Sequence, residues 1–501
     1  MKVDAFFQEL GILAVTFDDI DSEKFDVLVL PHYSEVIPAD VSTKTFFSKN
    51  TPLHIPLVGA GMEFMEHRLA IALAMEGGIG IIHRNLSIER QSSEIGKVKH
   101  YLHGGSIPNP KTVKPDETLE EVINRMRTNG WRYHSLPVVD AENKFVGLLT
   151  HNTFKFSMNA HALVRDVMVK NVLTVNVDVA NEEAFHLMLE HEKGALPVVN
   201  EEGYLKGLFV FEDLKRLYDG TSVSNVDTSG QLRVGGAVGV GDAERERCQE
   251  LCRNKCDVLV LDTAHADSRG VHEMLEWIKN ALCIDVVAGN IATEAAAKGL
   301  AERGVDGVKI GIGGGSICTT RVVTGIGIPQ LTAVWQCAKA LRGYDIPVCA
   351  DGGIRFSGDI AKAIVAGAHS VMMGGALAGT EEAAGEVFSL DGQLWKTNRG
   401  MGSLDAMRES KGSRERYNRR DDDEIVPQGI EGRVPFVGPA KKIIHQFVGG
   451  VRAAMGYNGA GTVGELQEKA DFVLQTSAGR KESHPHDVVI TKEAPNYSQE
   501  D

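Results

Sequence analysis

The chain has 501 residues, too many for one ordinary compact core, so we expect two domains or a barrel with an insertion. Its 43% hydrophobic and 24% charged residues and its 54 glycines exclude a disordered or fibrous protein and suit a fold with many strand–helix turns. The 53 basic and 68 acidic residues give a formal net charge of −15, which argues against a surface that binds an extended polyanion.

The N-terminal residues and the cysteines indicate the compartment. Residues 1–7 carry an acid early and lack the basic start of a signal peptide, and no apolar run is long enough to span a bilayer. Among seven cysteines, Cys283 and Cys349 lie in apolar runs that predict buried strands, which favours a reducing, cytoplasmic location. Three others recur every four residues, so we expect them on one face of a helix, where packing is favoured over metal binding: Cys248, Cys252 and Cys256.

An internal repeat marks an inserted domain. The stretches Leu-Pro-Val-Val-Asp (136–140) and Leu-Pro-Val-Val-Asn (196–200) lie 60 residues apart, and Gly147 and Gly207 repeat the same spacing. An amphipathic helix is predicted before each copy, over 119–128 and 182–192. The pattern resembles a tandem pair of CBS modules over about 107–219, whose cleft binds adenine or guanine nucleotides in that family. A purely structural lobe is the alternative interpretation.

Outside this insert, short apolar runs alternate with helical patterns such as 293–303 and 357–366. Alternation of this kind predicts a parallel sheet, and eight units of this size predict a closed (β/α)8 TIM barrel that the insert leaves after the second unit. In such barrels the chemistry lies on the loops after the strands' carboxyl ends. The eight expected strands are 55–60, 78–83, 234–240, 257–262, 284–289, 306–311, 346–350 and 369–373.

The loop after the sixth strand carries the candidate nucleophile. It reads Gly-Ile-Gly-Gly-Gly-Ser-Ile-Cys-Thr-Thr-Arg (311–321), and its glycines bring the backbone close to a ligand and leave amides and carbonyls free for ions. A thiol there, Cys318, can attack an electrophilic ring carbon. The alternative is a small buried cysteine beside a tight turn.

This loop and several other segments resemble those of IMP dehydrogenases and GMP reductases. The resemblance covers nearly the whole chain and implies a tandem CBS insert in a catalytic barrel, with the barrel formed by residues 1–106 and 220–501. The other matching segments are Glu-Gly-Gly-Ile-Gly (76–80), Asp-Thr-Ala-His (262–265), Ala-Gly-Asn (288–290), Asp-Gly-Gly-Ile-Arg (351–355), Leu-Ala-Gly-Thr-Glu-Glu (377–382), Arg-Gly-Met-Gly-Ser-Leu (399–404) and Gly-Tyr-Asn-Gly-Ala-Gly (456–461).

The region after the eighth strand favours the dehydrogenase. Gly-Ser-Arg-Glu-Arg-Tyr (412–417) and the segment 426–433 are similar to the mobile flap of IMP dehydrogenases, which we expect at about 392–440. Arg416 and Tyr417 match the pair that activates water there, with Thr320 as a partner, whereas 419–424 fits a solvated charged loop. The resemblance implies that Cys318 attacks purine C2 of IMP, that hydride passes to NAD, and that water then releases XMP in guanine nucleotide biosynthesis.

The resemblance also implies binding residues. Asp262 and Asn290 match residues beside the nicotinamide riboside of NAD. A potassium ion would meet carbonyls of Gly313, Gly315 and Cys318 and a neighbouring subunit's segment similar to Glu482, Ser483 and His484, which implies a homotetramer or octamer. The expected substrate-binding residues are Asp351 at the ribose, Ser316, Gly353, Gly374 and Gly375 at the phosphate, Met401, Gly402 and Gln428 at the base, and Met62.

The chain departs from the family pattern at the phosphate end. Gly59, Gly375 and Asn398 stand where hydroxyl residues are usual, and we expect these smaller or different side chains also to free space. The segment 20–25 interrupts the usual N-terminal run. Either backbone amides and other side chains hold a monophosphate, or the pocket takes a nucleotide with a different phosphate-side group. A GMP reductase, and a nucleotide-sensing CBS regulator with an inactive barrel, are the remaining alternatives.

Overall fold

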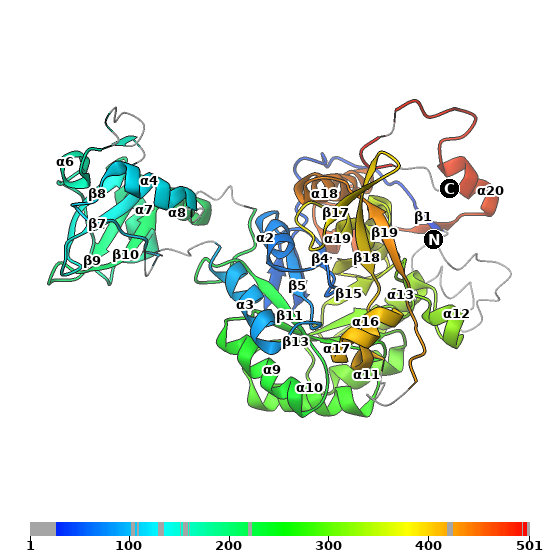
Figure 1. The fold of residues 1–501 in the computed structure, drawn as a ribbon. Helices are drawn as coiled ribbons and strands as arrows, with labels where there is room; N and C mark the ends of the chain where they lie inside the picture. The colour runs from blue at the N-terminus through cyan, green and yellow to red at the C-terminus, as the bar shows by residue number, and fades with distance from the viewer. Residues whose placement is uncertain are drawn as a thin grey trace. The chain divides into compact units, whose positions relative to one another are not determined.

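The computed structural model describes the chain from residue 27 onward, except for 102–105, 108–109, 129–134, 151, 154–158, 160, 219–222, 418–423, 493 and 498–501. The segment 20–25 therefore lies outside the described residues. Contacts divide the chain into two compact units (Figure 1). The inserted unit comprises His100–Ser222 and Val226–Gln231, and the barrel unit comprises the remaining residues.

Eight parallel strands close into a barrel in the order β11-β12-β13-β14-β15-β16-β4-β5. The two strands that precede the insert complete the ring, because Leu57 of β4 pairs with Val371 of β16 and Gly80 of β5 pairs with Val234 of β11. Each predicted strand is present, so the predicted TIM barrel is confirmed. The strands are β4 (Leu57–Gly59), β5 (Ile79–Ile82), β11 (Val234–Val238), β12 (Val258–Asp262), β13 (Asp285–Ile291), β14 (Gly307–Ile310), β15 (Val348–Asp351) and β16 (Ser370–Met373).

Helices cover the outside of the barrel, as α9, α10 and α11 do in Figure 1. The helix α10 shows the apolar stripe that the 3.6-residue period predicts, because it buries Val271, Leu275 and Ile278 and packs against β13. The helices are α2 (His67–Met75), α3 (Ile88–Lys99), α9 (Asp242–Arg253), α10 (Arg269–Ala281), α11 (Glu294–Ala301), α13 (Gln330–Ala340), α14 (Ser357–Val365), α18 (Ala440–Tyr457) and α19 (Val463–Lys469).

Short elements extend the barrel. An antiparallel sheet of β17 (Val387–Leu390), β18 (Gln393–Arg399) and β19 (Glu431–Pro435) lies in the predicted flap region. Two helices connect β18 to β19, α16 (Leu404–Glu409) and α17 (Lys411–Arg416). The others are α12 (Thr320–Thr324), α15 (Gly375–Ala378), α20 (Ser477–Ser483) and the paired strands β1 (Val27–Val29) with β20 (Phe472–Leu474) and β2 (Thr45–Ser48) with β3 (Thr51–Leu53).

The inserted unit contains the predicted repeat. The first copy has α4 (Leu119–Thr128), β7 (Ser135–Val139) and β8 (Phe145–Thr150), and the second has α7 (Asn181–Glu190), β9 (Ala195–Val199) and β10 (Leu205–Val210). The turns of the two hairpins meet, because the amide of Phe145 donates to the carbonyl of Gly203 at 2.9 Å. Each copy buries its own apolar cluster. The remaining elements are β6 (Ser106–Ile107), α6 (Val164–Val167) and α8 (Phe211–Tyr218).

Two of the cysteine predictions were wrong. Cys256 does not share a helix face with Cys248, because α9 ends at Arg253 and Lys255 takes a left-handed φ of 61° before β12 begins. Cys283 is exposed, because it lies in the connection before β13, whereas Cys349 is buried on β15 as predicted. Across the described residues, no group of three potential metal-binding His, Cys, Asp or Glu side chains was found, and no helix is long and apolar enough to cross a bilayer.

Candidate active site at the carboxyl end of the barrel

Two adjoining cavities open at the carboxyl ends of the strands. The larger has a volume of about 710 Å³ and the smaller about 130 Å³, and both are lined by Met62, Cys318 and Asp351. The larger adds the phosphate-side candidates Ser316, Gly353, Gly374 and Gly375, and the smaller adds Asp262, Asn290, Thr320, Met401, Gly402, Arg416, Tyr417 and Gln428. Loops far apart in sequence therefore bring the predicted substrate and catalytic residues together.

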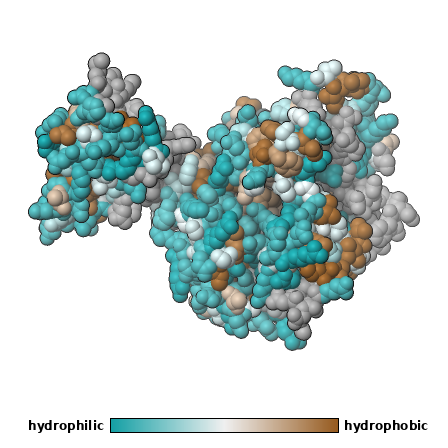
Figure 2. All heavy atoms as spheres, viewed as in Figure 1, coloured by the Kyte–Doolittle hydropathy of each residue, from teal (hydrophilic) through white to brown (hydrophobic). Residues whose placement is uncertain are grey.

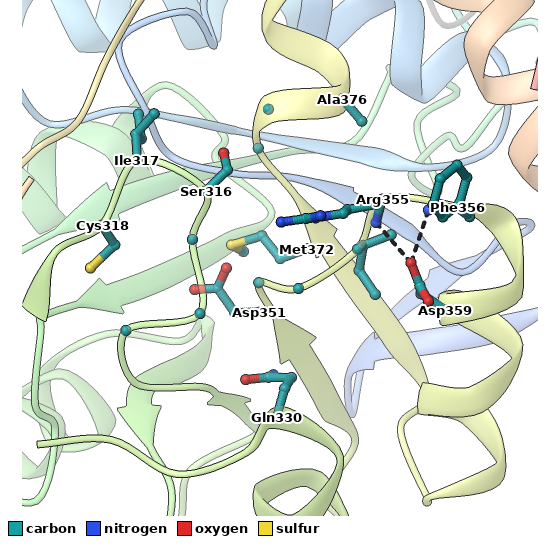
Figure 3. A pocket seen from close by; sticks show the side chains of 18 of the residues that line it. Ser316, Ile317, Cys318, Gln330, Asp351, Arg355, Phe356, Asp359, Met372 and Ala376 are labelled. Carbon is teal, nitrogen blue, oxygen red and sulfur yellow. Dashed lines mark hydrogen bonds between the residues drawn. The ribbon is translucent and has the colours of Figure 1, made fainter. Parts of the chain in front are cut away.

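The Cys318 loop is held from both sides. Arg321 closes it by donating to the carbonyls of Ile312, at 3.0 Å, and Ile328, at 2.7 Å. Gly313 has a φ of +72°, and an added Cβ there would lie 2.6 Å from the Arg321 side chain, so a glycine is required. Cys318 also forms an antiparallel bridge with Gly429 of the flap region. The thiol is thus fixed at the cavity wall, as Figure 3 shows.

The surroundings of Cys318 differ from those of the structural cysteines. Its Sγ lies 3.1 Å from the hydroxyl of Thr320 and 3.6 Å from the carbonyl of Gln428, and the residue is half-buried. Burial raises the pKa of Cys252 to about 11 and the pKa of Cys337 and Cys349 to about 12, so those thiols stay protonated at neutral pH. Cys318 is the cysteine that lines both cavities.

A buried lysine that the sequence analysis missed organises the centre of the site. Lys309 of β14 is 1% exposed, and its Nζ lies 2.8 Å from Asp351 Oδ2 and 3.1 Å from Asp262 Oδ1. The same ammonium donates to Asn290 Oδ1, and Asn290 Nδ2 donates to Asp351 at 2.9 Å. Lys309 therefore fixes three predicted site residues. A lysine inside an apolar strand, Gly-Val-Lys-Ile (307–310), was the available signal.

The flap residues Arg416 and Tyr417 lie in the smaller cavity. Arg416 forms an ion pair with Asp262, and its carbonyl accepts a hydrogen bond from the amide of Ala264 at 3.0 Å. Burial lowers the pKa of the Arg416 guanidinium and raises the pKa of the Tyr417 hydroxyl. Burial thus disfavours the charged form of Arg416, as a basic role would require. Asp262 partners both Arg416 and Lys309, so that one carboxylate compensates two cations.

The segments expected at the base pack closely against the flap. The amide of Gln428 donates to the carbonyl of Gly402 at 2.9 Å, and the amide of Thr319 donates to the carbonyl of Gln428 at 3.0 Å. A Cβ added at Gly402 would lie 2.7 Å from the Tyr417 ring, so only glycine admits Tyr417 here. Met401 is buried, and its sulfur accepts from Asn85 at 3.5 Å.

The phosphate end differs from the expectation at Gly59. We expected Gly59 to free space, but a Cβ there would meet Met65 at 2.2 Å and Leu73 at 2.6 Å, so neighbouring side chains already fill that space. The space at Gly375 is also limited, because a Cβ added there would lie 3.1 Å from the hydroxyl of Ser316, closer than an ordinary van der Waals contact. The amide of Gly353 donates to the carbonyl of Gly314 at 3.0 Å in this structure.

Two further side chains at the phosphate end, Arg355 and Asn398, had been given no binding role. Figure 3 shows Arg355 directing its guanidinium into the larger cavity between Ser316 and Met372. Asn398 lines the same cavity and is 3% exposed, and its Oδ1 has no hydrogen-bond partner among the described residues. The Arg355 guanidinium supplies positive charge where hydroxyls are lacking, and Asn398 Oδ1 supplies an unused hydrogen-bond acceptor.

The C-terminal candidates for the cation site are Glu482, Ser483 and His484. His484 lies against Phe356 and Tyr497, and its Nδ1 is 3.1 Å from the Tyr497 hydroxyl. Ser483 donates to the carbonyl of Gly479 at 2.9 Å. Both residues line the larger cavity, whereas Glu482 lines neither cavity and is exposed. The carbonyl of Gly315 accepts from the amide of Cys318 at 3.0 Å, which leaves it one lone pair for a cation.

The expected cofactor residues fit NAD only with the flap displaced. Asp262 is paired with Arg416 and Lys309, and the cavity beside it, at about 130 Å³, is well below the roughly 300 Å³ or more of usual small-molecule sites. In this structure Arg416 therefore occupies the space beside Asp262. Movement of Arg416 would uncover the carboxylate of Asp262 for a ribose diol.

Comparisons with known proteins agree with this site. The model of the IMP dehydrogenase / GMP reductase domain matches residues 14–486. The chain is 48% identical over 488 residues to an inosine-5′-monophosphate dehydrogenase of Aquifex aeolicus, covering 96% of this chain and 97% of the relative. It is 46% identical over 490 residues to the inosine-5′-monophosphate dehydrogenase of Escherichia coli K12, covering 97% and 98%.

A solved structure is also similar. A GMP reductase variant of Trypanosoma brucei, in complex with guanosine 5′-monophosphate, superposes with a TM-score of 0.84 at 37% identity, covering 95% of this chain and 100% of that one. The matched region includes the nucleophile loop, the barrel and the flap described above. By its sequence, its barrel and the residues at the barrel mouth, the chain belongs to the IMP dehydrogenase/GMP reductase family.

Proposed function

We propose that the protein is an NAD-dependent IMP dehydrogenase, which oxidises IMP to XMP in guanine nucleotide biosynthesis. The observation that carries the proposal is the junction of Cys318 with the flap pair Arg416 and Tyr417 around one cavity. A thiol alone would also serve a reductase. A half-buried arginine–tyrosine pair beside that thiol serves hydrolysis, which only the dehydrogenase needs. The relatives at 45–48% identity that carry the name IMP dehydrogenase support this choice.

The first half-reaction uses Cys318. Its thiolate adds to C2 of the purine, forming a C–S bond, and the C2–H electron pair leaves with the hydrogen as hydride. Asp262 and Asn290 would hold NAD, whose nicotinamide would supply the hydride acceptor. Asp351, held by Lys309 and Asn290, offers its other carboxylate oxygen to the ribose of the nucleotide. The product of this half-reaction is a thioimidate on Cys318.

The second half-reaction uses the flap. With α17 docked, Arg416 and Tyr417 fill the space beside Asp262 and exclude bulk water. One water adds to C2, its proton passes toward Arg416, and the C–S bond breaks to restore the Cys318 thiolate. The burial that lowers the pKa of Arg416 makes the neutral guanidine, which is the form that accepts a proton, more accessible than in a solvated arginine.

The monovalent cation, the oligomer and the inserted unit complete the proposal. Potassium would be held by the carbonyls of Gly313, Gly315 and Cys318, with a second subunit supplying the segment of Glu482. The exposed apolar side chains on and after α12, Val322, Val323 and Ile326, support a subunit contact beside this loop, as the hydrophobic surface over α12 in Figure 2 illustrates. The CBS pair would bind adenine or guanine nucleotides as a regulatory domain.

A second candidate is the same oxidation of an inosine nucleotide with a larger phosphate-side group. It is favoured by Asn398 Oδ1, which has no hydrogen-bond partner among the described residues, and by the volume of the larger cavity, about 710 Å³. Arg355 favours the monophosphate, because it supplies a cation beside Ser316 that can replace lost hydroxyl bonds. The monophosphate remains the main proposal.

One assay ranks these candidates. The protein is incubated with NAD and potassium and with IMP, inosine 5′-diphosphate or inosine, and NADH is followed by absorbance. We expect the highest kcat/KM with IMP. Preference for the diphosphate would favour the second candidate, and oxidation of NADPH with GMP, without NADH formation from any inosine compound, would identify a reductase. A protein inactive in all arms would contradict both proposals.

A further inference from the structure

The segment that follows β5 is the part of the barrel wall on which the flap helix α17 rests. Asn85 Nδ2 donates to the hydroxyl of Ser413 at 2.8 Å, and the hydroxyl of Ser410 donates to Asn85 Oδ1 at 2.9 Å. Between these contacts, a Cβ added at Gly412 would lie 3.1 Å from both the Arg84 carbonyl and Asn85 Oδ1. The helix backbone therefore approaches the wall as closely as a glycine allows.

An ion pair at the other end of α17 joins the same segment. Arg84 Nη1 lies 3.3 Å from Glu415 Oε2, and the Arg84 side chain is 1% exposed whereas that of Glu415 is 26% exposed. Gly239 provides the space for this guanidinium, because a Cβ there would lie 2.2 Å from Arg84 Nη1. Arg84 is thus a fixed, buried cation toward which the flap brings a carboxylate.

Glu415 supplies Arg84 with a carboxylate beyond the one that Arg84 shares with Arg247. Arg247 Nε pairs with Glu244 Oε1 at 2.9 Å, and Arg84 Nη1 lies 4.0 Å from Glu244 Oε2, so two cations share this carboxylate. Two nitrogens of Arg84, Nε and Nη2, have no hydrogen-bond partner in the described part of the chain. Removing Glu415 would leave a buried guanidinium poorly compensated, which is costly.

We propose that Arg84 and Asn85 form the dock of the flap, and that the Arg84–Glu415 pair sets how much of the time α17 is docked. Arg84 and Glu415 are positioning residues, because their described contacts are with protein groups and not with the cavity surface. The docking itself follows from the contacts above. Its kinetic consequence rests on the proposed function.

Docking places the next residue in the chain, Arg416, in the site. With Glu415 held by Arg84, the Arg416 carbonyl accepts from Ala264 and its guanidinium reaches Asp262. The nearby Arg84 charge also adds to burial in lowering the pKa of Arg416. Loss of the pair should therefore impair hydrolysis, which needs the docked flap, and spare hydride transfer, which needs Asp262 uncovered.

Hydrogen–deuterium exchange of the full-length protein without ligands tests the docking. Two variants weaken different contacts: Glu415→Gln removes the charge at constant shape, and Gly412→Ala forces the helix away from the wall. We expect the α17 amides to exchange about tenfold faster in both, since a tenfold change in the docking equilibrium corresponds to about 1.4 kcal/mol. Unchanged α17 exchange in both variants would overturn the proposal, whatever the activity of the enzyme.

Two matched controls separate docking from general loosening. Asp405→Asn removes an exposed carboxylate of α16 that pairs locally, with Arg408 at 3.5 Å. Gly432→Ala adds a methyl group to β19 at a position where no atom of the described residues lies within 4 Å. Both controls should exchange like the parent protein. If a control accelerated hydrogen–deuterium exchange of the α17 amides as much as its matched variant does, the dock would not be what holds the flap, and the proposal would be overturned.

Rapid-quench kinetics with IMP and NAD tests the consequence. For Glu415→Gln we expect a burst of NADH at the parent's rate, a steady-state rate about tenfold lower, and accumulation of the nucleotide adduct on Cys318 by intact mass. Equal losses of burst and turnover would overturn the role assigned to the pair. A parent protein that forms no NADH contradicts the proposed function, while the exchange experiment still decides the docking.

Discussion

Lys309 shows how one buried charge organises the chemistry of this family member. Its ammonium compensates the charges of Asp262 and Asp351 and orients Asn290. The residues expected to bind the ribose and the cofactor therefore depend on a side chain that is not itself expected to contact either ligand. An ammonium at this depth is stable only because it is fully partnered.

Replacing Lys309 by Met should therefore destabilise the barrel as well as disable it. The two carboxylates would lose their shared buried partner, and we expect the free energy of unfolding to fall by about 3–5 kcal/mol. The matched change Lys279→Met breaks a pair with Asp306 at 2.6 Å in which Lys279 is 30% exposed, and should cost less. Chemical denaturation of both variants measures the difference; equal losses would contradict a central role for Lys309.

Cys318 should be indispensable for chemistry and dispensable for folding. Cys318→Ala should lower kcat for NADH formation by about 10⁴-fold or more, because the covalent route is lost, while nucleotide binding persists. Cys283→Ala, at an exposed cysteine away from both cavities, is the matched control and should behave like the parent. Stopped-flow absorbance for turnover and calorimetry for binding decide; substantial turnover by Cys318→Ala would refute the nucleophile.

Sequence reasoning located residues that sit in dense motifs and missed isolated ones. The glycine-rich loop of Cys318 and the Arg416–Tyr417 pair were identifiable, because several unusual residues occur together there. Arg355 ends the motif Asp-Gly-Gly-Ile-Arg (351–355), but no role could be predicted for it, because the direction of its side chain depends on the local backbone. The prediction that Gly59 frees space was wrong, because the side chain of Met65, six residues later, turns back and fills that space.

At the scale of elements, the flap helix α17 is short and depends on its contacts. A helix of six residues has little stability of its own, so its position is set by Arg84, Asn85 and Asp262. Arg416→Ala should leave the NADH burst intact and slow hydrolysis, so that the Cys318 adduct accumulates. Intact mass spectrometry during turnover measures the adduct, and full turnover without adduct would refute the role of Arg416.

The segment after β5 should make the barrel acid-sensitive. Burial lowers the pKa of His83 from 6.5 to about 4, and neither ring nitrogen has a partner among the described residues. As pH falls below 6.5 the unfolded chain takes up this proton first, so stability is complete above 6.5 and is lost toward pH 4. Between pH 7.5 and 5 the loss should be about 2 kcal/mol.

The histidine origin of this loss can be isolated by substitution. His83→Leu should abolish the part of the pH dependence that His83 contributes, whereas His445→Leu, at an exposed position of α18, should not. Denaturation midpoints at the two pH values give the answer. An unchanged slope in His83→Leu would show that other groups cause the acid sensitivity.

The elements of the barrel were predictable because their pattern is redundant. Each strand is a short buried run with a helix after it, and the strand ends differ from the predicted ends by at most a few residues. The end of α9 was not predictable from the cysteine spacing, because Lys255 leaves the helical conformation without a glycine or proline. The flap sheet β17–β19 was unexpected, since its exposed strands lack an apolar pattern.

At the scale of the molecule, all eight barrel strands belong to one unit and the repeat belongs to the other. The 60-residue repeat was readable because two copies of one pattern reinforce each other. The nucleotide ligand of the inserted unit could not be predicted from the sequence, because the shape of a binding cleft depends on side chains from both copies of the repeat.

Excision of the inserted unit should preserve catalysis. Replacing residues 100–222 by a short flexible linker removes no barrel strand and none of the described lining of either cavity. We expect basal NADH formation within about threefold of the parent, and loss of any response to added ATP or GTP. A folded but inactive excised protein, judged by circular dichroism, would show that the insert contributes to the site itself.

The central claim is that Cys318 and the flap carry out hydride removal from C2 and then hydrolysis. It is tested most directly with IMP deuterated at C2, by measuring the label in the reduced cofactor and in the protein adduct. The account predicts deuterium in the reduced cofactor, XMP as product and an adduct on Cys318 that has lost the label. Reduced cofactor without deuterium, or XMP formed without an adduct in Arg416→Ala, would contradict it.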